Sequence, residues 1–96
     1  MSLGAEQRKF TAMIGKLITY TYEILGYELT FGESYNAAGV VHYVRLAQDF
    51  NVFKNGVFLT DGTGHKEMHD FWDSIGGAPR IDKDLNHYAL YWNGVR

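Results

Sequence analysis

Two histidines and two aspartates stand out in this sequence because their side chains can bind a metal ion or move a proton. His42 and Asp49 are seven residues apart, and Asp84 and His87 are three residues apart near the end of the chain. Two imidazoles and one carboxylate form a three-ligand set with an open fourth position, which is typical of a catalytic zinc site. Asp84 is then free to accept a proton from water without binding the metal. On spacing alone a second interpretation stays open, in which these side chains only cap helices, occupy turns or face solvent.

The composition of the 96 residues limits the classes of protein and of site. The chain has no cysteine, which excludes disulfide scaffolds, thiol catalysis and cysteine-based zinc sites. A net charge of -2 gives little electrostatic support for binding nucleic acid. Hydrophobic residues make up 46%, too many for a disordered chain. No run approaches the roughly 20 apolar residues of a membrane span. We therefore expect one domain over residues 1–96, with no nucleic-acid or membrane partner.

Two segments have the hydrophobic spacing of helices that cover a core. In the first, apolar residues recur every three or four positions from Phe10 to Leu25, and Gly26 follows as a C-terminal cap. In the second, over residues 65–75, the apolar side chains are again spaced for one face, and two glycines follow. Both segments are predicted to be helices that pack on a sheet.

Three segments have the pattern of strands. Residues 27–31 alternate between polar and apolar, and residues 46–59 form two apolar runs around Asn55-Gly56, the dipeptide that favours a two-residue hairpin turn. Residues 86–92 are predicted to be a final aromatic strand, and residues 33–41 a loop. The order of elements predicts an α+β domain with a small antiparallel sheet covered by helices.

This arrangement indicates how the four candidate residues are positioned. Asp49 lies on the first strand of the predicted hairpin, and His87 begins the final strand. His42 lies in the loop that leads into the hairpin. In a compact sheet the final strand lies next to the hairpin, so we expect these side chains to approach one another.

Several ordered segments resemble the M15 family of zinc D,D- and L,D-peptidases. The segment from His42 to Asp49 resembles that family's His-x-x-(Gly/Arg)-x-Ala-x-Asp motif. Residues 7–11, 26–33, 54–61 and 84–88 are similar, in the same order, to small phage and prophage members. The family includes D-alanyl-D-alanine carboxypeptidases and dipeptidases and phage L-alanyl-D-glutamate endolysins. Both specificities stay open for this chain.

The resemblance implies that His42, Asp49 and His87 are zinc ligands and that Asp84 is the catalytic base. It implies a Hedgehog/DD-peptidase-like fold, with zinc in a surface groove of an antiparallel sheet flanked by helices. The implied activity is that of a metallopeptidase, a hydrolase that cleaves an amide bond of the peptidoglycan stem peptide with metal-activated water. The implied setting is cell wall degradation by a phage endolysin, here a single peptidase domain over residues 1–96 with no separate wall-binding module. Because the chain begins without a signal-peptide pattern, we expect a monomer made in the bacterial cytoplasm that reaches the cell wall after holin-type release.

The chain departs from the family's pattern in the segment before the first ligand. Tyr35 is followed by Asn36, where family members usually carry an arginine that polarises the scissile carbonyl. The loop that follows is shorter than usual, and Val40 stands in place of a common serine. Arg45 and Arg80 are candidates to supply the missing charge. These departures keep open an alternative: a non-catalytic or weakly active zinc-binding relative that binds cell-wall peptide or a protein partner.

Other polar residues are weaker candidates for a site. His65 and His69 are spaced for one face of the second helix, but Lys66 stands where the His-Glu-x-x-His motif of metalloproteases has glutamate. We expect both histidines on a solvated face. Asp82 is a second candidate for the base, but its spacing to His87 departs from the family's motif.

Five aromatic residues near these segments have a structural or a functional interpretation. Phe71 and Trp72 are expected in the core, because they share a helical stripe with other apolar residues. For Tyr88, Tyr91 and Trp92, which flank the last predicted ligand, packing in the sheet and lining a groove stay equally open.

Overall fold

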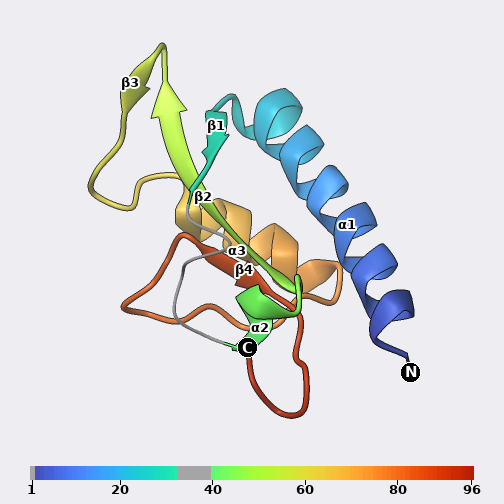
Figure 1. The fold of residues 1–96 in the computed structure, drawn as a ribbon. Coiled ribbons are helices and arrows are strands. Elements are labelled where there is room, and N and C mark those ends of the chain that lie inside the picture. The colour runs from blue at the N-terminus through green and yellow to red at the C-terminus, as the bar shows by residue number, and fades with distance from the viewer. Residues whose placement is uncertain (1, 33–39) are drawn as a thin grey trace.

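The computed structural model describes residues 2–32 and 40–96. The elements, in chain order, are α1 (Leu3–Tyr20), the π-helical turn η1 (Thr21–Leu25), β1 (Glu28–Phe31), α2 (Val40–Tyr43), β2 (Ala47–Lys54), β3 (Val57–Phe58), α3 (His65–Ser74) and β4 (His87–Ala89) (Figure 1). The predicted α+β class with a small antiparallel sheet is confirmed. No helix in the described part of the chain is long and apolar enough to span a bilayer.

The sheet is built around β2, which pairs antiparallel with the other three strands. β1 pairs with residues 50–53 of β2, β3 with residues 53–54 and β4 with residues 47–49. Within β2, the N–H of Phe50 donates to the carbonyl of Asn86, and the carbonyl of Val52 accepts from the N–H of Leu59. Because residues two apart in a strand direct their backbone groups to the same edge, β3 and β4 share one edge of β2. β1 occupies the opposite edge.

The predicted hairpin turn is confirmed. Asn55 and Gly56 both have positive φ, 51° and 77°, which is the conformation of a type I′ turn. The predicted final strand is correct in place but too long, because β4 ends at Ala89. A second tight turn at Asn93-Gly94, again with two positive φ values, pairs Trp92 with Val95 and removes the end of the chain from the sheet.

The predicted first helix is confirmed and begins earlier than its apolar pattern. The hydroxyl of Ser2 accepts a hydrogen bond from the backbone N–H of Ala5 and caps the helix. The last turn was not predicted to be π-helical. There the buried Thr21 donates its hydroxyl hydrogen bond to the carbonyl of Leu17, and Gly26, at φ 76°, ends the helix.

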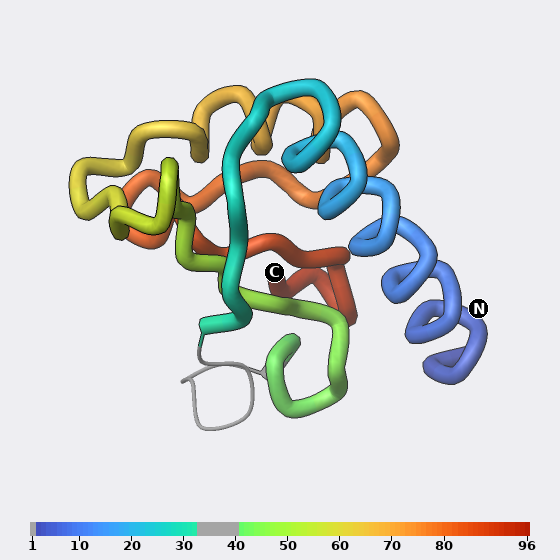
Figure 2. The backbone as a smooth tube through the Cα atoms, turned by 90° about the horizontal axis from the view of Figure 1, so that it is seen from above, coloured from blue at the N-terminus to red at the C-terminus, as the bar shows by residue number. Residues whose placement is uncertain are grey.

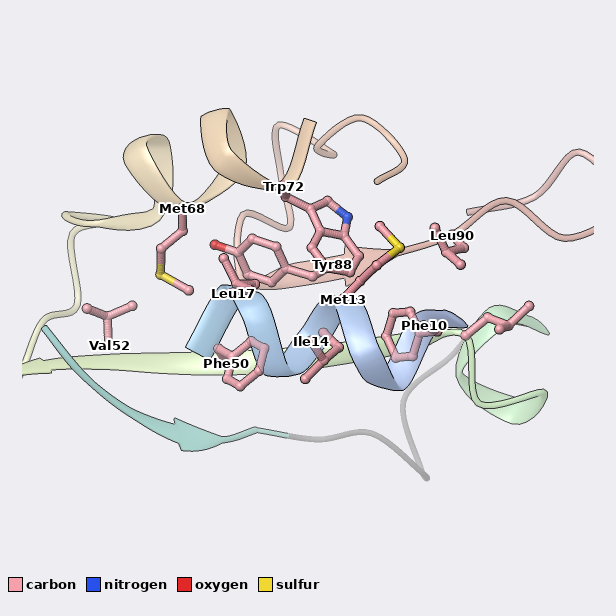
Figure 3. Close-up of a cluster of buried hydrophobic side chains, with 11 residues drawn as sticks. Phe10, Met13, Ile14, Leu17, Phe50, Val52, Met68, Trp72, Tyr88 and Leu90 are labelled. Atoms are coloured by element: carbon pink, nitrogen blue, oxygen red, sulfur yellow. The ribbon is translucent and has the colours of Figure 1, made fainter. Parts of the chain in front are cut away.

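The main core lies between one face of the sheet and the two long helices (Figure 3). Its buried members come from α1, β2, α3, β4 and the segments that flank the strands: Phe10, Met13, Ile14, Leu17, Leu46, Phe50, Val52, Met68, Trp72, Tyr88 and Leu90. Trp72 is fully buried and meets Phe10 edge to face at 5.8 Å between ring centroids. Phe71 is partly buried and stacks on Tyr20. The expected core position of Trp72 is therefore confirmed, and Phe71 packs against the edge of the core.

A smaller cluster covers the opposite face of β2 and β4. It consists of Val41, Ala47 and Ala89, with Trp92 packed against it. Viewed from above, α3 lies on one side of β2 and β4 and α2 on the other (Figure 2). The sheet is thus enclosed by long helices on one face and by a single helical turn on the other, where the candidate residues lie.

Candidate metal centre

His42 lies on the one-turn helix α2, so its expected place in a loop is wrong. The reason is a C-terminal capping motif: the N–H of Leu46 bonds to the carbonyl of Val41, and the N–H of Arg45 bonds to that of His42. Arg45 has φ 62°, the left-handed conformation that this Schellman motif requires. Residues 33–39 of the predicted loop lie outside the described residues. The motif ends the helix and directs the chain into β2.

Two alanines allow α2 to approach the sheet closely. Ala47 of β2 and Ala89 of β4 are direct cross-strand partners, and both are buried beneath Val41. Because neither alanine carries more than a methyl group, one turn of helix rests directly on the two strands. The neighbouring residue of that turn, His42, is buried as well, at 5% exposure.

The other two predicted ligands face each other on neighbouring strands. Asp49 and His87 form the cross-strand pair next to the two alanines, and directly opposed side chains lie about 4.5–5.5 Å apart at Cβ. Behind Asp49 the backbone of Gly32 approaches closely. Its N–H bonds to the carbonyl of Asp49 at 2.8 Å, and a Cβ at Gly32 would lie 3.2 Å from the Cβ of Asp49.

Three ligand atoms converge between α2, β2 and β4. His42 Nε2 lies 3.0 Å from His87 Nδ1, and Asp49 Oδ1 lies 3.3 Å and 3.4 Å from those two nitrogens. All three residues are buried. The structure therefore brings together the three residues that the sequence predicted as ligands.

These distances fit the edges of a metal coordination sphere. Zinc binds imidazole nitrogen and carboxylate oxygen at about 2.0–2.2 Å, so neighbouring ligand atoms of a tetrahedral site are about 3.3–3.6 Å apart. The two distances to Asp49 Oδ1 fall in that range, and the distance between the nitrogens is slightly shorter. Three ligands account for three vertices of a tetrahedron, which leaves the fourth for water or substrate.

The buried carboxylate is the clearest indication that this site could hold a cation. Asp49 Oδ1 is buried and forms no hydrogen bond with any described residue, although two ring nitrogens lie near it. A buried carboxylate oxygen without a partner costs several kcal/mol. One proton shared between His42 and His87 satisfies those two nitrogens but not the oxygen. A metal ion bound by all three atoms satisfies each of them, so this triad could hold one.

Asp84 lies at the edge of this triad and not in it. Its carboxylate is 4.0 Å from His87 Nδ1, and about half of its side-chain surface is exposed. A turn in which the N–H of His87 bonds to the carbonyl of Asp84 holds the two residues together. Asp82 is mostly exposed and pairs with Arg80 instead, at 3.4 Å. Of the two aspartates considered as the base, Asp84 is therefore the one that lies beside the triad.

The residues considered as replacements for the family's arginine do not reach the triad. Arg45 is exposed at the end of α2, and Arg80 pairs with Asp82. Neither guanidinium forms an ion pair with a triad residue in the described part of the chain. Asn36 lies outside the described residues, and Val40 begins α2.

The expectation that His65 and His69 lie on a solvated face is wrong. Both are buried, at 6% and 1% exposure, because residues 65, 68, 69 and 72 share the stripe of α3 that faces the core. His65 Nδ1 lies 2.6 Å from the hydroxyl of Tyr88, and His69 Nε2 lies 2.6 Å from the carbonyl of Leu85. Burial lowers the pKa of His65 to about 4 and also lowers the pKa of His69. Both histidines are three or four residues from Met68 or Trp72, and this helical spacing was the signal that could have predicted their burial.

The three aromatic residues near His87 have different roles. Tyr88 is fully buried in the main core, where its ring stacks on His69 at 4.1 Å between centroids and burial raises the pKa of its hydroxyl. Trp92 packs on the small cluster beneath α2, and Tyr91 is half exposed. Packing therefore accounts for Tyr88 and Trp92.

Comparison of the chain with family models, curated proteins and solved structures gave no match.

Proposed function

We propose that this chain is a zinc-dependent hydrolase that cleaves an amide bond of the peptidoglycan stem peptide, as an endolysin-like metallopeptidase does. The observation that carries the proposal is the convergence of His42 Nε2, Asp49 Oδ1 and His87 Nδ1 with the Asp84 carboxylate beside them. The choice of substrate rests on the sequence motifs and not on the site geometry.

In this proposal His42, Asp49 and His87 bind the metal. A bound zinc ion supplies a Lewis acid for the scissile carbonyl and lowers the pKa of water toward neutrality. Zinc is proposed because two imidazoles, one carboxylate and an open position are typical of its catalytic sites, although manganese and nickel accept the same ligands.

Asp84 is the proposed catalytic base. Its carboxylate accepts the proton of the attacking water and then donates it to the leaving amine. Its position supports this role, because it lies 4.0 Å from a ligand nitrogen and is half exposed, so that water and substrate can reach it.

A second candidate function is a zinc-binding relative with weak or no catalysis that binds wall peptide or a protein partner. It is favoured by the absence of an arginine contact with the triad in the described residues. Loss of one preorganised group at a developing oxyanion costs on the order of 10²–10³ in rate. The enzyme is preferred because Asp84 binds no metal and has no evident role in the core.

Metal content and turnover, measured together, test the proposal. Purified chain and its Asp84→Asn variant would be analysed for bound zinc and then incubated with purified peptidoglycan while new amino termini are counted. We expect one zinc ion per chain in both proteins and release of amino termini by the wild type only. Zinc without release from any wall type would favour the second candidate, and absence of zinc would overturn both.

A further inference from the structure

The sheet face that carries Asp49 continues along β2 beyond the triad. Alternate residues of a strand direct their side chains to one face, and directly paired residues of neighbouring strands share that face. Asn51 and Phe53 therefore lie on the face of Asp49, about 7 and 13 Å farther along β2. The paired strands add three more residues, and together the five form what we call the platform: Glu28, Thr30, Asn51, Phe53 and Phe58.

The platform is open to solvent and adjoins the triad. α2 rests on the sheet at Ala47 and Ala89, at the other side of Asp49. Three of the platform residues are exposed and two are half-buried, and the β2–β3 hairpin that carries part of the platform projects from the rest of the fold (Figure 1). On β1, the position beside Asp49 is Gly32, which has no side chain to separate the triad from the platform.

Two aromatic rings form the far end of the platform. The rings of Phe53 and Phe58 have centroids 5.4 Å apart, and Phe58 is 51% exposed. Neither ring packs in the two core clusters of the described part of the chain. A sheet face in contact with water usually carries polar side chains, so this pair offers a ligand an aromatic surface on which to stack.

Contacts on two sides of the hairpin hold the platform in place. The carboxylate of Glu28 accepts a hydrogen bond from the N–H of Gly56 in the hairpin turn, at 2.8 Å. The ammonium group of Lys54 donates to the carbonyl of Gly26 at 2.9 Å and lies over the ring of Tyr27. A surface that is fixed before binding loses less conformational entropy when a ligand binds.

The polar groups of the platform favour an uncharged ligand. Glu28 is its one charged residue and already accepts the hydrogen bond from the turn. Lys54 alternates with Phe53 and so belongs to the opposite face. Asn51 donates to the hydroxyl of Thr30 across a long 3.4 Å, which leaves the amide and the hydroxyl able to bond to a ligand. The matching ligand has an apolar face and neutral polar groups around it.

We propose that the platform binds an N-acetylated sugar ring of the peptidoglycan glycan, stacked on Phe53 and Phe58 and hydrogen-bonded by Asn51 and Thr30. A pyranose presents C–H groups on its faces and neutral hydroxyl and acetamido groups around its rim. The stem peptide, in contrast, carries free carboxylates, for which the platform has no cation. This inference rests on the proposed function for the identity of the ligand. Because the glycan is joined to the first residue of the stem peptide, a sugar on the platform directs that end of the peptide to the triad.

Binding of a sugar without a peptide tests the platform separately from hydrolysis. N,N′-diacetylchitobiose would be titrated into the intact chain while backbone amide chemical shifts are recorded. We expect saturable shifts at Thr30, Asn51 and Phe53. Cellobiose, which has the same linkage but no acetamido groups, should bind about fivefold more weakly, because it lacks hydrogen bonds made by those groups.

Phe58→Leu tests the stacking, because leucine is apolar but has no ring. It should weaken binding of N,N′-diacetylchitobiose about fivefold, whereas Phe58→Trp should retain it. Phe31→Leu is the matched control: Phe31 is also exposed, at 65%, but it pairs with Phe50 and so belongs to the opposite face. It should leave sugar binding unchanged.

Three results would overturn the inference: no shift at the platform with either sugar, equal weakening by the two leucine variants, or platform shifts that follow protein concentration instead of sugar, which would indicate a second copy of the chain. In an active chain, KM should be lower for N-acetylmuramyl-L-alanyl-D-isoglutamine than for N-acetyl-L-alanyl-D-isoglutamine, and Phe58→Leu should remove the difference. A chain that binds the sugar on the platform but releases no amino termini from peptidoglycan retains the platform and loses the proposed hydrolase. A chain that cleaves both dipeptides with equal KM loses only the platform.

Discussion

Zinc should stabilise the folded chain strongly, because its proposed ligands come from three separate elements. His42 lies on α2, Asp49 on β2 and His87 on β4, and only the folded chain brings their ligand atoms within 3.4 Å of one another. The unfolded chain has no such preformed site. Metal binding therefore favours the folded state by mass action.

The size of this effect follows from the affinity and the length of the chain. At a free zinc concentration of 100 times Kd, binding stabilises the folded state by about 2.7 kcal/mol. For a domain of 60–100 residues, each kcal/mol raises the melting temperature by about 4–8 °C. For this chain of 96 residues, we therefore expect zinc to raise the melting temperature by roughly 10–20 °C.

Thermal unfolding followed by circular dichroism, in EDTA and in excess zinc, measures this increase. Two aspartate variants with the same chemical change provide the comparison. Asp49→Asn removes a proposed ligand and should abolish the increase, whereas Asp84→Asn, at the half-exposed proposed base, should retain it. An unchanged melting temperature in zinc, or equal loss of the increase in both variants, would refute the assignment of ligands.

Two further predictions concern the support of the site and the buried histidines. Gly32→Ala should lower zinc affinity about 10-fold, because the new Cβ would lie 3.2 Å from the Cβ of Asp49. Gly15→Ala is the control, since no atom lies within 4 Å of its new Cβ, and it should leave zinc affinity unchanged. Competition with a chelator measures both affinities, and equal affinities in the wild type and both variants would contradict this role of Gly32. The second prediction is loss of stability in acid. The pKa of His65 is lowered in the folded state from 6.5 to about 4, so the unfolded chain binds its proton first as pH falls. The free energy of unfolding should therefore decrease by about 2 kcal/mol as the pH falls from 6.5 to 4, a figure that allows for partial screening of His65 by solvent. Urea unfolding in EDTA should show a smaller decrease for His65→Asn than for the wild type, and identical pH profiles would exclude His65 as the cause.

Local pattern was enough to predict the two long helices, the hairpin and most of the candidate site, but it did not predict the one-turn helix α2. The hairpin followed from Asn55-Gly56, because few dipeptides adopt two positive φ values in succession. The first helix followed from apolar residues at helical spacing, since that spacing exists only where one face is buried. His42, Asp49 and His87 were predicted from residue type, spacing and the resemblance of the surrounding motif, and the structure places their ligand atoms together.

Tertiary structure decided what depends on contacts between distant segments. His65 and His69 were expected in solvent because Lys66 lies between them, but packing of α3 against Tyr88 buries both rings. The sequence could not show that β3 and β4 share one edge of β2, because strand propensity does not say which edge of β2 each strand occupies. Residue type and spacing thus determined which side chains are capable of binding a metal. Strand pairing and helix packing decided which of them meet, because those contacts join residues far apart in the chain and exist only when it is folded.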